Sequence, residues 1–211
     1  MLELSNGEKL KCEFEYLRYY GHHNHGELYS CCVRSLNNLN NNSSIDGYLG
    51  VHKPNKNDTD VRGISIWDTN AKHIPANLGS LFHLIAFVMV GTQLFEIKTK
   101  DFHGMQNLER INLNNNKLTS VPLDAFATLT KLRFIDLEYN QIEELPNGIF
   151  KNNLELIEIY LFQNKIKYLG TEIFNDLKKL NYVDLGDNIC INKKYDGATE
   201  IIQLKNDIKM N

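Results

Sequence analysis

Residues 108–118 read Leu108-Glu-Arg-Ile111-Asn-Leu113-Asn-Asn-Asn116-Lys-Leu118 and contain the pattern that organises the chain. Apolar residues occupy positions 1, 4, 6 and 11 of this unit and asparagine occupies position 9, which is typical of a short strand followed by a turn. Copies of the unit, about 24 residues apart, begin at Val61, Leu84, Leu132, Leu156 and Leu180. One such unit cannot bury its apolar row alone, so the sequence predicts a solenoid of stacked units.

The second half of each unit is patterned as well. Position 14 holds Ile97, Val121, Leu145 and Leu169, and position 19 holds Phe102, Phe126, Phe150 and Phe174. A phenylalanine that returns at one position of every unit predicts a buried spine rather than a ligand site. The asparagine at position 9 is expected to bond backbone groups in the turn, because backbone that leaves a strand needs such a partner.

These features resemble the typical class of extracellular leucine-rich repeats. The expected fold is a leucine-rich repeat solenoid with a curved parallel β-sheet on the concave face and irregular or 3-10 segments on the convex face. We assign residues 61–192 to the array, with six repeats of which the first is degenerate. Residues 193–211 are predicted to form a short helical C-terminal cap, with Thr199 as its candidate N-cap.

Residues 1–60 carry no repeat and are predicted to form an N-terminal cap. The alternation in 11–16 is typical of a half-buried strand, and 28–33 is a candidate partner strand in a β-hairpin. Cys12 is expected to form a disulfide with Cys31, and Cys32 remains an alternative partner. His22, His23 and His25 lie between these strands, where a solvated hairpin tip is favoured over a metal site because no fourth ligand has a suitable spacing.

The cap is similar to that of secreted leucine-rich repeat proteins of dipteran insects. The similarity rests on Cys12-Glu-Phe14, Tyr29-Ser-Cys31 and residues 57–64. In those families the last repeat runs into a cysteine cap, and Cys190 matches its first cysteine. The resemblance implies a partner for Cys190 near or beyond residue 211, so the C-terminal cap is expected to be truncated.

Several features favour a protein made for an oxidising compartment. The four cysteines lie near the two ends of the array, which suits disulfide-stapled caps. Asn41, Asn42 and Asn57 are candidate glycosylation acceptors. No run of 18 apolar residues predicts a membrane span, and residues 1–7 lack a hydrophobic signal segment. We therefore expect a secreted, extracellular glycoprotein whose signal peptide has been removed, with a cytosolic origin as the alternative.

Side chains at positions 3, 5, 7 and 8 are expected to project from the concave face. The aromatic residues at these positions are Trp67, Phe134, Tyr139, Tyr160, Phe162 and Tyr182. The acidic ones are Asp68, Asp136, Glu138, Glu158, Asp184 and Asp187, and Arg110 is the one base, which makes a formal charge of −5 against −3 for the chain. Exposed aromatics and a local charge predict a protein-binding site for a partner with a basic surface, with a generic solvated sheet as the alternative.

Other functions are disfavoured. An acidic face does not suit nucleic acid. The carboxylates are expected on an open sheet without a pocket that could separate their pKa values, and the sequence has no Ser/His/Asp constellation, phosphate loop or HExxH segment. We therefore expect no enzyme, cofactor or metal. The sequence indicates a secreted recognition module, which the dipteran resemblance places in insect immunity or cell-surface signalling; the alternatives are the ectodomain of a membrane-anchored receptor or adhesion protein, and a structural spacer.

Overall fold

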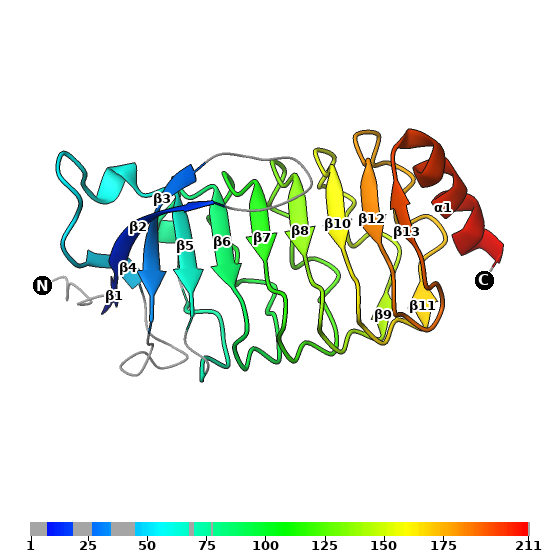
Figure 1. The fold of residues 1–211 in the computed structure, drawn as a ribbon, viewed down its shortest axis with the longest axis horizontal. Coiled ribbons are helices and arrows are strands. Elements are labelled where there is room, and N and C mark those ends of the chain that lie inside the picture. The colour runs from blue at the N-terminus through cyan, green and yellow to red at the C-terminus, as the bar shows by residue number, and fades with distance from the viewer. Residues whose placement is uncertain (1–7, 19–26, 35–44, 68–69, 77, 211) are drawn as a thin grey trace, which may run out of the picture.

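The computed structural model describes residues 8–18, 27–34, 45–67, 70–76 and 78–210. Six short strands lie side by side along the molecule (Figure 1): β5 (Gly63–Ile66), β6 (Ala86–Met89), β7 (Arg110–Asn112), β8 (Phe134–Asp136), β10 (Glu158–Tyr160) and β12 (Tyr182–Asp184). Neighbouring strands pair in parallel, and from β6 to β12 each residue lies opposite the one 24 positions later. The predicted leucine-rich repeat solenoid is confirmed.

The N-terminal end of the sheet is an antiparallel hairpin, as predicted. Strands β2 (Glu13–Arg18) and β3 (Glu27–Val33) pair with each other, and β3 pairs in parallel with β5, so the hairpin continues the sheet of the repeats. A separate two-stranded parallel sheet joins β1 (Glu8–Lys11) to β4 (Ile45–Leu49). The sheet is therefore parallel from β3 through the repeats and antiparallel within the hairpin, between β2 and β3.

The C-terminal end carries the predicted helix. Strand β13 (Lys194–Asp196) pairs antiparallel with β12, and helix α1 (Ala198–Met210) lies at this end of the array (Figure 1). Ile201, Leu204 and Ile208 are its buried residues, at helical spacing. The helix begins one residue before Thr199, so the prediction that Thr199 is its N-cap was wrong.

Turns and short elements connect the strands on the opposite side of the solenoid. The 3-10 helices η1 (Asp58–Asp60) and η2 (Leu78–Ser80) precede β5 and β6. Strands β9 (Glu144–Leu145) and β11 (Tyr168–Leu169) form a small parallel sheet of their own. These irregular and 3-10 return segments agree with the expected convex face.

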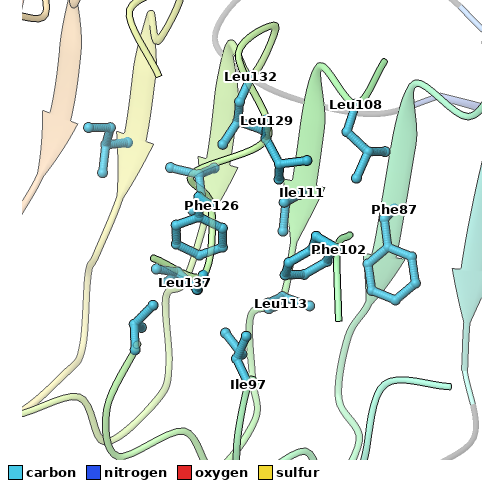
Figure 2. Packing of buried hydrophobic residues seen from close by; sticks show 14 of the residues in the cluster. Phe87, Ile97, Phe102, Leu108, Ile111, Leu113, Phe126, Leu129, Leu132 and Leu137 are labelled. Atoms are coloured by element: carbon cyan, nitrogen blue, oxygen red, sulfur yellow. The ribbon is translucent and has the colours of Figure 1, made fainter. Parts of the chain in front are cut away.

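One apolar core runs through the length of the solenoid, and Figure 2 shows part of it. Phe102, Phe126, Phe150 and Phe174 are each at most 1% exposed. Their rings follow one another at centroid distances of 5.9, 6.3 and 6.3 Å. The phenylalanine column is thus the buried spine that the period of the sequence predicted.

The asparagine column bonds the backbone between repeats. In Asn140, Nδ2 donates to the carbonyl oxygens of Leu113, Leu137 and Glu138, and Oδ1 accepts the N–H of Leu118. Asn116, Asn164 and Asn188 make equivalent bonds. This column holds each turn to the preceding repeat, because it pairs backbone groups that have no strand neighbour.

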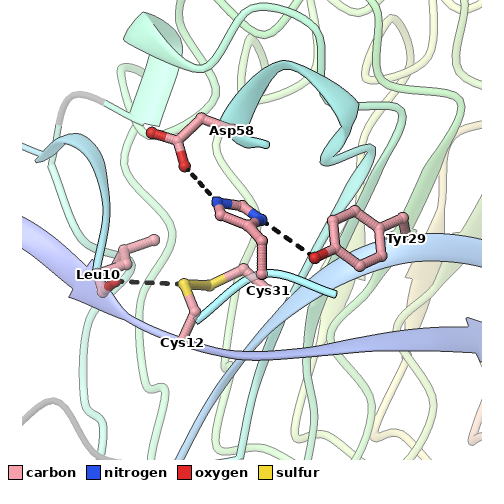
Figure 3. Close-up of a disulfide and its surroundings, with 6 residues drawn as sticks. Leu10, Cys12, Tyr29, Cys31 and Asp58 are labelled. Atoms are coloured by element: carbon pink, nitrogen blue, oxygen red, sulfur yellow. Dashed lines mark hydrogen bonds and ion pairs between the residues drawn. A yellow bond between two sulfur atoms is a disulfide. The ribbon is translucent and has the colours of Figure 1, made fainter. Parts of the chain in front are cut away.

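The N-terminal cap is held by a disulfide and a polar network, shown in Figure 3. Cys12 is bonded to Cys31, the pairing preferred from the sequence, and Cys32 is a buried free thiol. Nearby, Nδ1 of His52 lies 3.0 Å from the hydroxyl of Tyr29, and Nε2 lies 2.8 Å from Oδ1 of Asp58. The histidine therefore links β3 to the segment that leads into β5.

Candidate functional site

The N-terminal hairpin also lies over part of the concave face. Leu17 of β2 and Leu28 of β3 pack with Val90 against the buried side chains of Ala86 and Val88. The alternation in 11–16 predicted a half-buried strand but not this second apolar contact. The direction in which a hairpin bends is absent from the repeat period, so the sequence offered no signal for it.

A cavity of about 840 Å³, open to solvent, lies between this hairpin and the strands from β5 to β10. Its lining consists of Tyr16, Leu17, Arg18, Ser65, Trp67, Val88, Val90, Asn112, Asn114, Phe134, Asp136, Glu138 and Tyr160. This volume is typical of small-molecule sites. The prediction of an open sheet without a pocket was therefore wrong, because the hairpin turns part of the sheet into a cavity wall.

The structure divides the predicted concave-face residues into two groups. The cavity is lined by Trp67, Phe134, Asp136, Glu138 and Tyr160. The residues that do not line it are Tyr139, Glu158, Phe162, Tyr182, Asp184 and Asp187. Sequence reasoning missed the hairpin residues Tyr16, Leu17 and Arg18, since nothing in the repeat pattern connects them with the concave face.

Much of the predicted aromatic patch is packed together rather than exposed. The ring of Tyr160 lies 5.1 Å from that of Phe134 and 4.9 Å from that of Tyr182. Phe134 and Tyr182 are only 6% and 4% exposed, and Glu158, at 1%, accepts a hydrogen bond from the Tyr160 hydroxyl. Rings on strands about 4.8 Å apart cover one another, so projecting from the sheet does not expose them.

Two of the predicted acidic residues have structural partners. Oδ1 of Asp136 accepts the N–H of Glu138 at 3.0 Å, and its Oδ2 accepts from Nδ2 of Asn114 at 2.9 Å. Oδ1 of Asp184 accepts the N–H of Gly186 at 2.9 Å in the same way. A carboxylate that caps the N–H two residues onward supports the turn after the strand. Part of the acidic signal in the sequence therefore reflects turn structure.

Glu138 is a half-buried carboxylate in the cavity wall. Burial raises the pKa of its carboxyl group to about 7, and the charges of Asp136 and Asp184 act in the same direction. Arg18, which also lines the cavity, is paired with Glu27 at 2.9 Å and is not among the groups that shift this pKa. A cation beside Glu138 would offset both the burial and the repulsion.

The stability of the protein should depend on pH through Glu138. Since its pKa rises from 4.5 to about 7 on folding, the folded protein keeps a proton that the unfolded chain releases, and stability falls as pH rises through this range. Glu138→Gln cannot ionise, so at pH 8 it should be more stable than the parent by about 1 kcal/mol after solvent screening. Thermal melts should show a gain of about 2–4 °C at pH 8 and none at pH 4.

Glu143→Gln is the matched control, because Glu143 is an exposed carboxylate paired with Lys167. It should show no gain at pH 8. An equal gain for both variants, or a Glu138→Gln gain that does not change with pH, would contradict the assignment.

The residue at position 8 ends the strand in a left-handed turn. Gly91, Asn115, Tyr139, Gln163 and Asp187 have φ values between 50° and 65°. Position 8 was expected to project from the concave face together with positions 3, 5 and 7, and its left-handed backbone places this residue in the turn after the strand. Tyr139 is a costly residue for such a turn, yet it stays 46% exposed with its ring 5.5 Å from that of Phe162.

The remaining predicted sites can be placed only in part. His22, His23, His25, Asn41, Asn42 and Asp68 lie outside the described residues. Asn57 is exposed and caps η1, with Oδ1 accepting from the backbone and the hydroxyl of Thr59. Cys190 is a half-buried free thiol. In the part of the chain that the structure describes, histidine, cysteine and carboxylate side chains form no cluster suited to a metal ion.

None of the helices among the described residues combines the length and the apolar character that a membrane crossing requires.

Comparison with known proteins agrees with this architecture. A family model described as "Leucine rich repeat" matches residues 88–142 and 136–189. Human opticin is 41% identical over 54 residues, which are 26% of this chain and 16% of opticin. Bovine asporin is 31% identical over 116 residues, which are 54% of this chain and 29% of asporin. The chain thus spans less than a third of each of these relatives.

Solved structures show the same fold. A chain of the Toll–Spatzle complex, described as a molecular hub in Drosophila development and innate immunity, superposes with a TM-score of 0.55 at 24% identity. The match covers 63% of this chain and 18% of that one. The glycosylated form gives a TM-score of 0.56 at 23% identity, over 63% of this chain and 19% of its own.

Proposed function

We propose that this chain, whose fold is a leucine-rich repeat solenoid, is a secreted recognition module that binds a protein partner with a basic surface through its concave face. The observation that carries the proposal is the exposure of aromatic and acidic side chains in the turns that follow the strands. There Tyr139 is 46% exposed with Phe162 beside it, and Asp187 is exposed on the same column of turns. Exposed aromatics near carboxylates suit binding to lysine and arginine side chains.

The disulfide supports the proposed location. Bonds such as Cys12–Cys31 form and persist in oxidising compartments and are rare in the cytosol. The resemblance of the cap to dipteran proteins supports a role in insect immunity or cell-surface signalling. The same face would also serve the ectodomain of an anchored receptor or adhesion protein, and a membrane span or lipid-anchor signal in the full-length transcript would select that alternative. A spacer without a ligand would show no specific partner.

Replacing Tyr139 with asparagine tests the face without disturbing the fold. The same position of the preceding repeat is Asn115 with φ 55°, so asparagine suits this turn. Relief of the left-handed strain should offset the lost ring contact with Phe162, leaving the melting temperature within about 2 °C of the parent. Affinity for a partner captured from hemolymph should fall at least about tenfold in surface plasmon resonance.

Tyr168→Asn is the matched control, because Tyr168 is 52% exposed on β11, among the return segments. It should bind like the parent. Doubling the salt concentration should slow association of the parent with its partner, as expected for an acidic surface. If Tyr168→Asn abolished binding while Tyr139→Asn did not, the partner would lie on another surface.

A further inference from the structure

The cavity under the N-terminal hairpin has an apolar end and an acidic end. Leu17, Val88 and Val90 line the end at β6, and Trp67, which directly follows β5, also lines the cavity. Asp136 and Glu138 line the end at β8. Two strand spacings separate β6 from β8, which is about 10 Å. The cavity therefore presents apolar and anionic walls at the two ends of a short ligand-sized span.

Among the described residues, no basic side chain offsets the negative charge at the acidic end of the cavity. Asp136 is held by the N–H of Glu138 and the amide of Asn114, both neutral groups. The charged groups that act on Glu138 are Asp136 and Asp184, which are both acidic. Arg18, in the opposite wall, is engaged by Glu27. A carboxylate that is partly removed from water and faces like charges is stabilised by a bound cation.

We infer that this cavity binds a small organic cation, an ammonium group on an apolar body about 10 Å long. The ammonium group contacts Glu138 beside Asp136, and the ring of Tyr160 on the neighbouring strand β10 adds cation–π attraction. The apolar body lies along β6 between Leu17 and the Trp67 ring. The cavity is open to solvent, and its volume of about 840 Å³ suits a small molecule, whereas Tyr139 of the proposed protein site does not line it.

Trp67 makes the site directly observable. It is the single tryptophan of the chain and is 43% exposed, so its fluorescence should report an occupant of the cavity. Titration with n-octylammonium should give a saturable change. n-Octanol, which has the body without the charge, should bind at least about tenfold more weakly, as should octanoate and methylammonium. Binding of n-octanol as tight as that of n-octylammonium would overturn the role of the carboxylates.

Two variants separate the contribution of the Glu138 carboxylate to binding from that of the apolar wall. Glu138→Gln should weaken n-octylammonium binding about tenfold and leave n-octanol binding unchanged. Glu143→Gln, an exposed carboxylate outside the cavity, should bind both compounds like the parent. In the parent, affinity for n-octylammonium should fall about tenfold from pH 8 to pH 6 as Glu138 takes up a proton, and Glu138→Gln should lose this dependence.

A final experiment tests whether the cavity binds a free amine or the lysine side chain of a peptide. A short peptide with one central lysine between leucines presents the same ammonium chemistry on a larger body. Weaker binding of this peptide than of n-octylammonium supports the small-molecule site. If the peptide alone binds, or if no probe changes Trp67 fluorescence in a folded sample, the proposal is wrong. Tyr139→Asn should bind n-octylammonium like the parent, so failure of the protein site and failure of this one are distinguishable.

Discussion

The Asn140→Ala variant is expected to lose about 3 kcal/mol of unfolding free energy. The asparagine is 7% exposed and pairs four backbone groups, namely the N–H of Leu118 and the carbonyl oxygens of Leu113, Leu137 and Glu138. Alanine leaves these groups in a site where water has little access. Each unpaired buried group costs about 1–3 kcal/mol, and relaxation of the turn recovers part of the sum.

Thermal and urea melts measure this loss. For a chain of this length, 3 kcal/mol corresponds to a fall of about 6–12 °C in the melting temperature. The control is Asn206→Ala, since Asn206 is exposed on α1 and alanine is a better helix former. That variant should match or slightly exceed the parent. An Asn140→Ala variant that melts within about a degree of the parent would refute the structural role of the asparagine column.

Removing the cap disulfide should have an effect of similar size. The Cys12→Ser, Cys31→Ser double variant should lose about 3 kcal/mol, because the bridge closes a loop with a sequence separation of 19 and restricts the unfolded chain. Both sulfurs lie in the core beside Phe14, so the hairpin also loses packing. Urea unfolding of the oxidised parent, the reduced parent and the variant would measure the difference.

Cys190→Ser is the control at the other end of the solenoid and should cost less than about 1 kcal/mol. Non-reducing peptide mapping should find Cys12 linked to Cys31. Burial raises the pKa of Cys32 to about 11, so iodoacetamide should label it more slowly than the half-buried Cys190. A Cys12–Cys32 link, or four free thiols in protein from an oxidising compartment, would contradict the structure.

The repeating part of the fold could be predicted because each repeat contacts mainly its neighbours. Position 1 of the pattern, as in Leu108, is fully buried, and position 19, as in Phe126, forms the spine. These roles follow from a constant angular position on the solenoid. The position 9 amide, as in Asn140, likewise has one geometry to satisfy in every repeat.

The exposure of the candidate site residues could not be predicted from their positions in the repeat. Phe134 and Trp67 both project from the concave face by strand alternation, yet Phe134 is 6% exposed and Trp67 is 43% exposed. The difference depends on which side chains stand on adjacent strands. Tyr160 covers Phe134, and this contact joins residues 26 positions apart in the chain.

The sequence by itself determined the solenoid, its phenylalanine spine and its asparagine column, because these depend on a periodic pattern of apolar and amide side chains. It also determined the hairpin and helix of the two caps, because each has its own local pattern of apolar residues. Only the tertiary structure decided that the hairpin lies against Val88 and forms one wall of an open cavity, since that contact depends on how a non-repeating segment bends. It also decided the chemistry of Glu138, whose pKa reflects burial and the neighbouring charges of Asp136 and Asp184, groups that only the folded sheet gathers.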